Sequence, residues 1–436
     1  MIAKKISALT ATNLVVANMI GTGVFTSLGF QVAGITSDFA LIALWIVGGI
    51  AALCGALSYA ELATALPRSG GEYHYLSKIY HPSVGFLSGW ISVVVGFPAP
   101  IALAGIAFGG YFKIFTPGIS PIFLSLLIIW IVTAVHLFGL RVEEMFQNGS
   151  TFLKIGLVLV LIVAGLMMAN PQPLNLFPGP GTLPILLSRP FAVDLVYVMY
   201  AYSGWNAAAY ITDEVRNPAK NVPWALLIGT LVVTAFYLTL NFVFLRTTPK
   251  SVLAGQLEVG LLAGQAIFGP IGGKIVSLLI GLGLIATISA MAWIGPRITR
   301  RMAEDLPKLR LLGRSSKKGT PYVATILQVI IATLLVMTGT FETVLFYTQF
   351  SLILCSFLTV LGLIVLRVRE PGLERPYRVW AYPVVPIFFL VVTLWMMIHV
   401  ILGQPKESLL GLITVLAGLI IYFFAKEPGR PIHTQP

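Results

Sequence analysis

The chain has 436 residues, of which 57% are hydrophobic and only 10% are charged. This composition excludes an ordinary soluble enzyme, because apolar stretches of about 20 residues, the length that crosses a bilayer, recur along the whole sequence. The net charge of +12 is compatible with a nucleic-acid partner or with a membrane surface. The positions of the charged residues along the chain distinguish these two possibilities.

Twelve apolar stretches are long enough to be membrane-spanning helices. They cover residues 7–33, 38–64, 83–112, 119–140, 147–169, 191–214, 222–245, 270–298, 321–339, 342–367, 381–402 and 407–425. The first stretch is too long for a signal-peptide core and no small-residue cleavage site follows it, so we expect a retained first helix. The predicted fold class is an all-α integral membrane protein, with one transmembrane domain over residues 1–436.

The basic residues are distributed unequally between the two sides of this predicted topology. With the N-terminus inside, the outer connections carry only Lys113, Arg189, Arg246, Lys250, Lys274 and Lys406. Most of the remaining Lys and Arg residues lie in the inner connections, and such an excess on the inner side follows the positive-inside rule. It predicts both termini in the cytoplasm and a multi-pass protein of the plasma (inner) membrane, and it removes the need for a nucleic-acid partner. Topology also explains the basic cluster at 297–318, with anionic membrane lipid as an alternative partner.

Several functional classes find no support in the sequence. Cys54 and Cys355 lie in apolar stretches, and no Cys/His cluster has metal-ligand spacing, so no disulfide, metal or cofactor is predicted. A phosphate-binding loop is absent from the sequence, which argues against an ATP-driven pump. No cluster of His, Asp or Cys marks one membrane face, which argues against an enzyme. A receptor that binds without transporting is kept as an alternative.

Two of the apolar stretches are interrupted near their centres, at residues 21–23 (GTG) and 202–206 (YSGWN). Unwound backbone persists at membrane depth only where it lines a cavity or is buried in protein. Broken helices at corresponding positions are typical of transporter binding sites. Because the breaks fall in the first and sixth spans, the two five-helix units enter from opposite sides. This predicts an inverted repeat of residues 7–169 and 191–367, with the helices of 381–425 as additions.

The first break has the chemistry of a zwitterion site. A half-helix that ends at Ile20 exposes carbonyl groups and attracts a cation, and one that starts near Val24 exposes amides and attracts an anion. An ammonium and a carboxylate one carbon apart would meet both ends at once. Gly21 and Gly23 let the backbone turn and let a ligand approach it. The alternative is that these glycines only allow close helix packing.

At these residues the chain resembles the amino acid–polyamine–organocation superfamily, and within it the L-type amino acid transporter branch, over nearly its whole length. The matching motifs are GTGVF at 21–25, YAEL at 59–62, PRSGGEY at 67–73, YAYSGWN at 200–206 and DEVRNPAKNVP at 213–223. The resemblance implies a LeuT-like fold of twelve helices, a 5+5 inverted repeat with broken helices 1 and 6, plus helices 11 and 12.

The resemblance also implies a substrate site. The Thr22 and Gly23 amides would hold a carboxylate, and main-chain carbonyls of both breaks would receive an α-ammonium. The implied substrate-binding set is Met19, Ile20, Gly21, Thr22, Gly23, Tyr200, Ser203 and Asn206. Tyr200 stands where relatives often place a Phe gate, and Trp293 is a second candidate gate, with simple packing as its alternative.

Four further polar residues were assigned from their positions. Lys154 lies within the fifth apolar stretch, where an ionisable residue indicates function. The resemblance implies that its ammonium replaces the sodium ion of sodium-coupled relatives and bridges helices 1 and 5; a proton relay and snorkelling to the surface are the alternatives. Glu61 is expected in a loop or inner-gate network. Asp194 and Glu342 are expected near water-exposed ends.

The predicted function is sodium-independent secondary transport of amino acids, foremost small or neutral L-amino acids, by alternating access, with exchange (antiport) as one mode. The alternative is a proton-coupled symporter or a transporter of cationic amino acids or polyamines. Because no Cys lies in an outer loop, we expect no covalent heavy-chain partner of the kind that eukaryotic relatives use. The oligomeric state is left open, with a monomer among the options.

Overall fold

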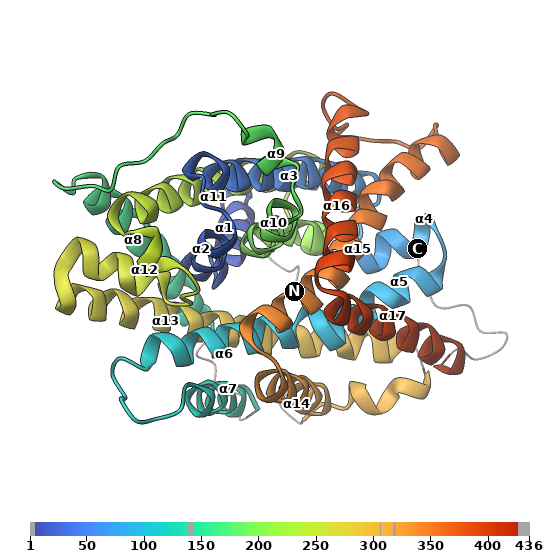
Figure 1. The fold of residues 1–436 in the computed structure, drawn as a ribbon. Helices are drawn as coiled ribbons and strands as arrows, with labels where there is room; N and C mark the ends of the chain where they lie inside the picture. Colours follow the sequence, from blue (N-terminus) through green and yellow to red (C-terminus); the bar gives the residue numbers. More distant parts are fainter. Residues whose placement is uncertain (1–4, 138–142, 306, 317–319, 426–436) are drawn as a thin grey trace. The chain divides into compact units, whose positions relative to one another are not determined.

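The computed structural model describes residues 5–137, 143–305, 307–316 and 320–425. Within these ranges the regular structure is helical, apart from an isolated parallel bridge between Ile6 and Val215. The predicted all-α class is therefore confirmed. The chain forms two compact units, each assembled from segments that are far apart in the sequence. Figure 1 labels the helices and colours them by their position in the sequence.

Unit 1 comprises residues 1–75, 153–279 and 353–403. Its complete helices are α1 (Ala8–Met19), α2 (Gly23–Gly34), α3 (Asp38–Ala65), α9 (Thr182–Leu186), α10 (Arg189–Tyr202), the 3-10 helix η2 (Ala207–Glu214), α11 (Pro218–Thr247), α12 (Lys250–Leu253) and α16 (Val384–Gly403). Helix α11 packs on α1 and α3, and α10 packs on α2, α3 and α16. Both interrupted stretches belong to this unit.

Unit 2 comprises residues 76–152, 280–352 and 404–436. Its complete helices are α5 (Pro82–Ile91), the π-helical turn η1 (Ser92–Gly96), α6 (Pro98–Phe112), α7 (Pro121–Leu137), the 3-10 helix η3 (Pro307–Gly313), α14 (Tyr322–Thr338) and α17 (Pro405–Ala425). The helices divided between the units are α4 (Gly71–Ile79), α8 (Glu143–Leu166), α13 (Val259–Asp305) and α15 (Phe341–Arg369). In unit 2, α6 packs on α7 and α14, and α17 packs on α5.

Neither unit coincides with a half of the sequence. The predicted repeats, 7–169 and 191–367, each contribute segments to both units. The predicted inverted repeat concerns the topology of the chain and not its compact units, so it stays a prediction.

Nine helical segments of the described chain are long and apolar enough to cross a membrane: Ala8–Gly34, Asp38–Ala65, Pro82–Phe112, Gly149–Leu166, Pro218–Thr247, Val259–Arg300, Phe341–Arg369, Val384–Gly403 and Pro405–Ala425. Helices α7 and α14 are apolar but shorter, with 17 residues each. The predicted stretch at 191–214 is divided between α10 and η2. A multi-pass membrane protein is therefore supported, and the count of twelve spans stays a prediction.

Helices α3 and α10 begin at side-chain caps. The Ser37 hydroxyl accepts a hydrogen bond from the Ala40 amide at the start of α3, and the Ser188 hydroxyl accepts one from the Phe191 amide at the start of α10, both at 3.3 Å. Such caps satisfy amides that have no partner within the helix. From residue 39 to residue 57, α3 is apolar on all faces, which is typical of a helix surrounded by lipid or protein.

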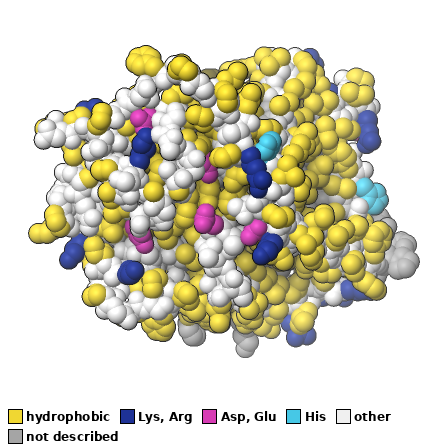
Figure 2. All heavy atoms as spheres, in the orientation of Figure 1, with side chains coloured by type: hydrophobic (Ala, Val, Ile, Leu, Met, Phe, Trp, Pro, Cys, Tyr) yellow, Lys and Arg dark blue, Asp and Glu magenta, His cyan; other side chains and the backbone are white. Residues whose placement is uncertain are grey.

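Large apolar side chains also lie on the surface. Many Leu, Ile and Phe side chains are more than one third exposed, including those of α7, α16 and α17. Apolar side chains cover much of the face shown in Figure 2, and charged side chains are scattered among them. Exposed apolar surface on this scale is what contact with lipid requires.

Candidate functional site

The first interrupted stretch breaks where the sequence predicts it. Helix α1 ends at Met19, the Ile20 amide closes its last turn on the Val16 carbonyl (3.0 Å), and α2 begins at Gly23. Thr22 stands at the N-cap of α2, and its side chain makes no capping hydrogen bond. A carbonyl-rich helix end and an amide-rich helix end therefore face the same short, unwound segment.

The two glycines of this segment have different surroundings. A Cβ atom built on Gly21 would meet only the Met19 carbonyl oxygen, at 3.9 Å. A Cβ atom built on Gly23 would lie 2.5 Å from the Cα of Ala201, closer than real contacts allow. Gly23 therefore serves the close packing of α2 on α10, which was the alternative interpretation. Gly21 has room beside its backbone, as ligand approach requires.

The second break follows the end of α10 at Tyr202. The Ser203 amide donates to the Tyr200 carbonyl (3.0 Å), and the Ser203 hydroxyl donates to the Met199 carbonyl (3.2 Å). Gly204 then adopts a φ of +101°, a conformation that glycine reaches without strain. A Cβ atom at Gly204 would also lie 2.9 Å from the carbonyl carbon of Asn18, so this break is packed tightly against the last turn of α1.

The two breaks meet at a residue that the sequence did not single out. Tyr237 of α11 is fully buried, and its hydroxyl lies 2.5 Å from the Met19 carbonyl oxygen and 3.1 Å from that of Ala201. Its single proton is shared between carbonyls in the last turns of α1 and α10. A carbonyl oxygen has two lone pairs, so Met19 retains acceptor capacity for an ammonium. The sequence did not predict this role, because Tyr237 lies in a largely apolar helix. Its own hydroxyl, a polar group inside α11, is the one feature that could have indicated it.

Tyr200 and Asn206 extend the contacts across the second break. The Tyr200 side chain is half-buried and interacts with the Thr22 side chain of the first break. The Asn206 side chain interacts with Tyr210 of η2. The structure thus gathers the predicted residues of both breaks into one region of unit 1.

Lys154 and Trp293 are placed differently. Lys154 is only 9% exposed on α8, so its side chain is enclosed by protein and does not snorkel along the surface. Its predicted bridge to helix 1 stays a prediction. Trp293 of α13 lies in unit 2, 40% exposed, with the Arg297 guanidinium 3.6 Å from its ring centroid. That stacking accounts for the present position of the ring, and the gate role stays a prediction.

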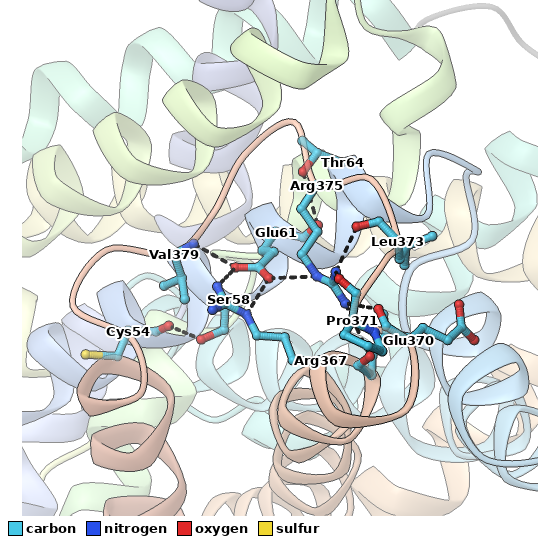
Figure 3. Close-up of polar contacts among 11 residues, drawn as sticks. Cys54, Ser58, Glu61, Thr64, Arg367, Glu370, Pro371, Leu373, Arg375 and Val379 are labelled. Carbon is cyan, nitrogen blue, oxygen red and sulfur yellow. Dashed lines mark hydrogen bonds and ion pairs between the residues drawn. The ribbon is translucent and has the colours of Figure 1, made fainter.

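A buried ion-pair network lies at the C-terminal end of α3 (Figure 3). The Glu61 carboxylate is fully buried and accepts hydrogen bonds from Arg367 at 2.8 and 2.5 Å and from the Val379 amide at 2.7 Å. The Arg375 Nε lies 3.5 Å from the same carboxylate. The network joins α3 to the end of α15 and to the loop that leads into α16, as expected for a loop network.

Arg375 and Tyr377 complete the surroundings of Glu61. The other Arg375 nitrogens donate to the carbonyls of Leu366, Glu370 and Leu373, so Arg375 also caps the last turn of α15. The Tyr377 hydroxyl is buried and has no hydrogen-bond partner among the described residues. Burial, together with the nearby Glu61 carboxylate, raises the pKa of Tyr377 to about 12.

Opposite-charge contacts also hold the other end of α3. The Lys250 ammonium contacts both the Asp38 carboxylate and the Thr36 carbonyl at 2.6 Å, and the Asn175 amide donates to Asp38 at 3.0 Å. The expectation that Asp194 is exposed to water is wrong: it is 7% exposed, because α10 is enclosed by α2, α3 and α16. Glu342 is exposed, as expected.

Comparison with known proteins identifies the family. A model of the family described as amino acid permease matches residues 6–424. The chain belongs to the amino acid permease family. This confirms the resemblance to the amino acid–polyamine–organocation superfamily and its L-type branch, and it makes this permease a transporter of amino acids rather than an enzyme.

The permease is similar to several transporters over nearly its full length. It is 31% identical to the b(0,+)-type amino acid transporter 1 of Mus musculus over 98% of this chain and 91% of the relative. It is 27% identical to the serine/threonine exchanger SteT of Bacillus subtilis, over 97% of each chain. It is also 27% identical to the Asc-type amino acid transporter 1 of Homo sapiens, over 99% of this chain and 84% of the relative.

Proposed function

We propose that this permease exchanges small or neutral L-amino acids across the plasma membrane by alternating access, without sodium. The observation that carries this proposal is the meeting of two helix breaks within unit 1. The carbonyl ends of α1 and α10 and the amide end of α2 lie together there. The charges of an amino acid, ammonium and carboxylate on one carbon, complement these ends.

The proposed contacts follow from these helix ends. The Thr22 and Gly23 amides hold the carboxylate, and the carbonyls of Met19, Tyr200 and Ser203 receive the ammonium. Ile20 and Gly21 provide the turn between the two half-helices, and Asn206 lies beside the substrate. The open space beside Gly21 supports this assignment, as does the interaction between the Tyr200 and Thr22 side chains that would close over the ligand.

Exchange is supported by the relatives, one of which is named a serine/threonine exchanger. Sodium independence is supported by the buried Lys154, whose ammonium the family resemblance implies in the place of the ion of sodium-coupled relatives. Operation without a covalent partner is supported by Cys54 and Cys355, which are both buried. The proposed topology places both termini in the cytoplasm, on the evidence of the Lys and Arg distribution.

Counterflow in proteoliposomes tests the proposal. Vesicles that contain purified protein and unlabelled serine should accumulate labelled serine equally well in sodium and in choline buffer, and equally well with the proton gradient dissipated. Stimulation by sodium would contradict the role given to Lys154. Dependence on a proton gradient without internal substrate would favour the symport alternative, and a preference for arginine or a polyamine would favour the cationic alternative.

A matched pair of glycine variants tests the site itself. Gly21→Ala places a methyl group in open space beside the break, so we expect a folded protein with a raised KM for serine. Gly156→Ala on α8 also enters open space, with no atom of either break within 4 Å of the added methyl group, and its KM should stay unchanged. Equal KM values for the two variants would contradict ligand approach at Gly21.

A further inference from the structure

A buried carboxylate, Glu72, lies close to the second break. It stands in the first turn of α4 and is 6% exposed. Its Oε1 accepts hydrogen bonds from the Tyr59 hydroxyl of α3 and from the Ser356 hydroxyl of α15, the latter at 3.1 Å. Glu72 is part of the motif at 67–73, but neither helix break uses it. A buried carboxylate held by hydroxyl groups from two other helices needs a physical explanation.

One chain of contacts leads from Glu72 to the substrate site through Tyr210. The Tyr210 ring lies against Gly71, where a Cβ atom would be 2.5 Å from the ring, and Tyr210 interacts electrostatically with Glu72. The Tyr210 side chain also interacts with the side chain of Asn206. Asn206 is the proposed side-chain contact of the substrate, so Glu72 is two side chains away from the ligand.

A second chain leads through Tyr59 to the same break. The hydroxyl of Tyr59 donates to Glu72, and its ring meets Trp205 edge-to-face with 4.8 Å between centroids. Trp205 directly precedes Asn206 in the sequence. Two neighbouring residues of the break are therefore contacted by aromatic side chains that both interact with one carboxylate.

The packing of the loop between α3 and α4, and of the start of α4, against η2 does not depend on Glu72 alone. The Gly70 amide donates to the Tyr210 carbonyl and the Tyr75 hydroxyl donates to the Ala209 carbonyl, both at 3.3 Å. The Ser69 hydroxyl donates to the Asp213 carboxylate. These bonds hold the loop between α3 and α4 against η2 whether or not residue 72 is charged. Glu72 can thus be changed with the docking bonds in place.

We infer that Glu72 is a positioning residue of the amino acid site, which acts through Tyr210 on Asn206 and through Tyr59 on Trp205. The inference rests on the proposed function and extends it to a residue outside the two breaks. A carboxylate accepts strong hydrogen bonds from the hydroxyls of Tyr59 and Ser356, whereas an amide offers one acceptor oxygen and adds two donors. Loss of the charge therefore loosens Tyr59 and changes the electrostatic interaction with Tyr210, and these two side chains contact Trp205 and Asn206 of the break.

The test compares Glu72→Gln with Tyr210→Phe, their combination and Glu72→Asp. Serine counterflow in proteoliposomes gives KM and the maximal rate, and thermal unfolding in detergent reports on the fold. We expect Glu72→Gln and Tyr210→Phe each to raise KM by about tenfold or more, which corresponds to about 1.4 kcal/mol of lost binding. The double variant should resemble Glu72→Gln, because that substitution already interrupts the chain of contacts that passes through Tyr210. Glu72→Asp keeps the charge and should recover part of the affinity.

Ser69→Ala serves as the control, because it removes a docking bond without touching Glu72. We expect its KM to equal that of the wild type. A folded Glu72→Gln variant with wild-type KM would overturn the inference. So would an equal rise in KM and an equal fall in melting temperature in Glu72→Gln and Ser69→Ala. If Glu72→Gln does not fold, Tyr210→Phe decides alone: an unchanged KM overturns the inference. Wild-type protein that exchanges no amino acid would instead refute the proposed function.

Discussion

Replacing Glu61 by Gln should destabilise unit 1 strongly. The substitution preserves the size of the side chain but removes the negative charge between Arg367 and Arg375, whose side chains are only 20% and 5% exposed. The remaining amide oxygen can accept two of the three bonds from Arg367 and Val379, so at least one bond to a charged group is lost and its buried donor is left unpaired. At roughly 1.5–3 kcal/mol for the bond and a further 1–3 kcal/mol or more for the unpaired buried donor, the loss is about 3–6 kcal/mol.

This magnitude agrees with the roughly 3–5 kcal/mol observed when one partner is removed from a buried ion pair. The assay is thermal unfolding of the purified protein in detergent, where the expected fall in melting temperature is on the order of 5 °C or more. Glu370→Gln is the matched control, because Glu370 is exposed and contributes only its backbone carbonyl to the network. Its effect should lie within about 0.5 kcal/mol.

A double variant separates the charge from the packing. In Glu61→Gln combined with Arg367→Met, the cation closest to the lost carboxylate is also gone, so the double variant should be less destabilised than the sum of the single variants. Equal melting temperatures for Glu61→Gln and Glu370→Gln would refute the reasoning, because a fully buried and fully bonded carboxylate would then contribute nothing.

Three further predictions concern single side chains. Gly23→Ala should cost about 1–3 kcal/mol through overpacking against Ala201, and should melt below Gly156→Ala in the same assay, since residue 156 has open space around it. Lys154→Met should leave a folded protein with exchange reduced at least about tenfold, measured by counterflow; full activity would contradict the role of the ammonium. Tyr377→Phe removes a buried hydroxyl without a partner, so its melting temperature at pH 7 should equal or exceed that of the wild type. Because the pKa of Tyr377 is raised from 10.0 to about 12 in the fold, wild-type stability should fall between pH 10 and 12 as the unfolded chain loses this proton, and the Phe variant should lack that component.

The breaks were predictable from local sequence because their signals are local. Residues 21–23 and 202–206 interrupt apolar runs with glycine, serine and asparagine, and the structure ends α1 at Met19 and α10 at Tyr202. Gly204 takes a positive φ, which explains why that position is glycine. Residues of these types interrupt a helix through their own backbone preferences, so a few neighbouring positions are enough to predict the break.

The partners of these breaks were not predictable, because they come from distant segments. Tyr237 is separated from Met19 by 218 positions, and nothing in the apolar pattern of α11 distinguishes its hydroxyl from any other. The sequence predicted a water-exposed Asp194, but the burial of this residue depends on the helices that surround α10, and these come from other parts of the chain. The roles of Gly21 and Gly23 could likewise be separated only by the position of Ala201, which belongs to another helix.

The π-helical turn η1 is a further feature that the sequence did not predict. It follows α5 directly, and the Phe97 amide donates to the Ser92 carbonyl five residues back, at 3.1 Å. Pro98 begins α6 without an amide hydrogen, which removes one bond of the regular pattern. The proline predicts a disturbance of the helix, but the sequence of 92–96 gives no sign that the chain resolves it with a π turn.

The Glu61 network also has a consequence for how the protein is made. The carboxylate and Arg367 are 306 residues apart in the chain, and Val379 follows later still. At about 5–20 residues per second, roughly 15–60 s of synthesis separate the carboxylate from its first cationic partner. During that interval the Glu61 carboxylate must stay hydrated, because an unpaired charge is not tolerated in an apolar interior. The end of α3 can therefore take its final place only after most of the chain has been translated.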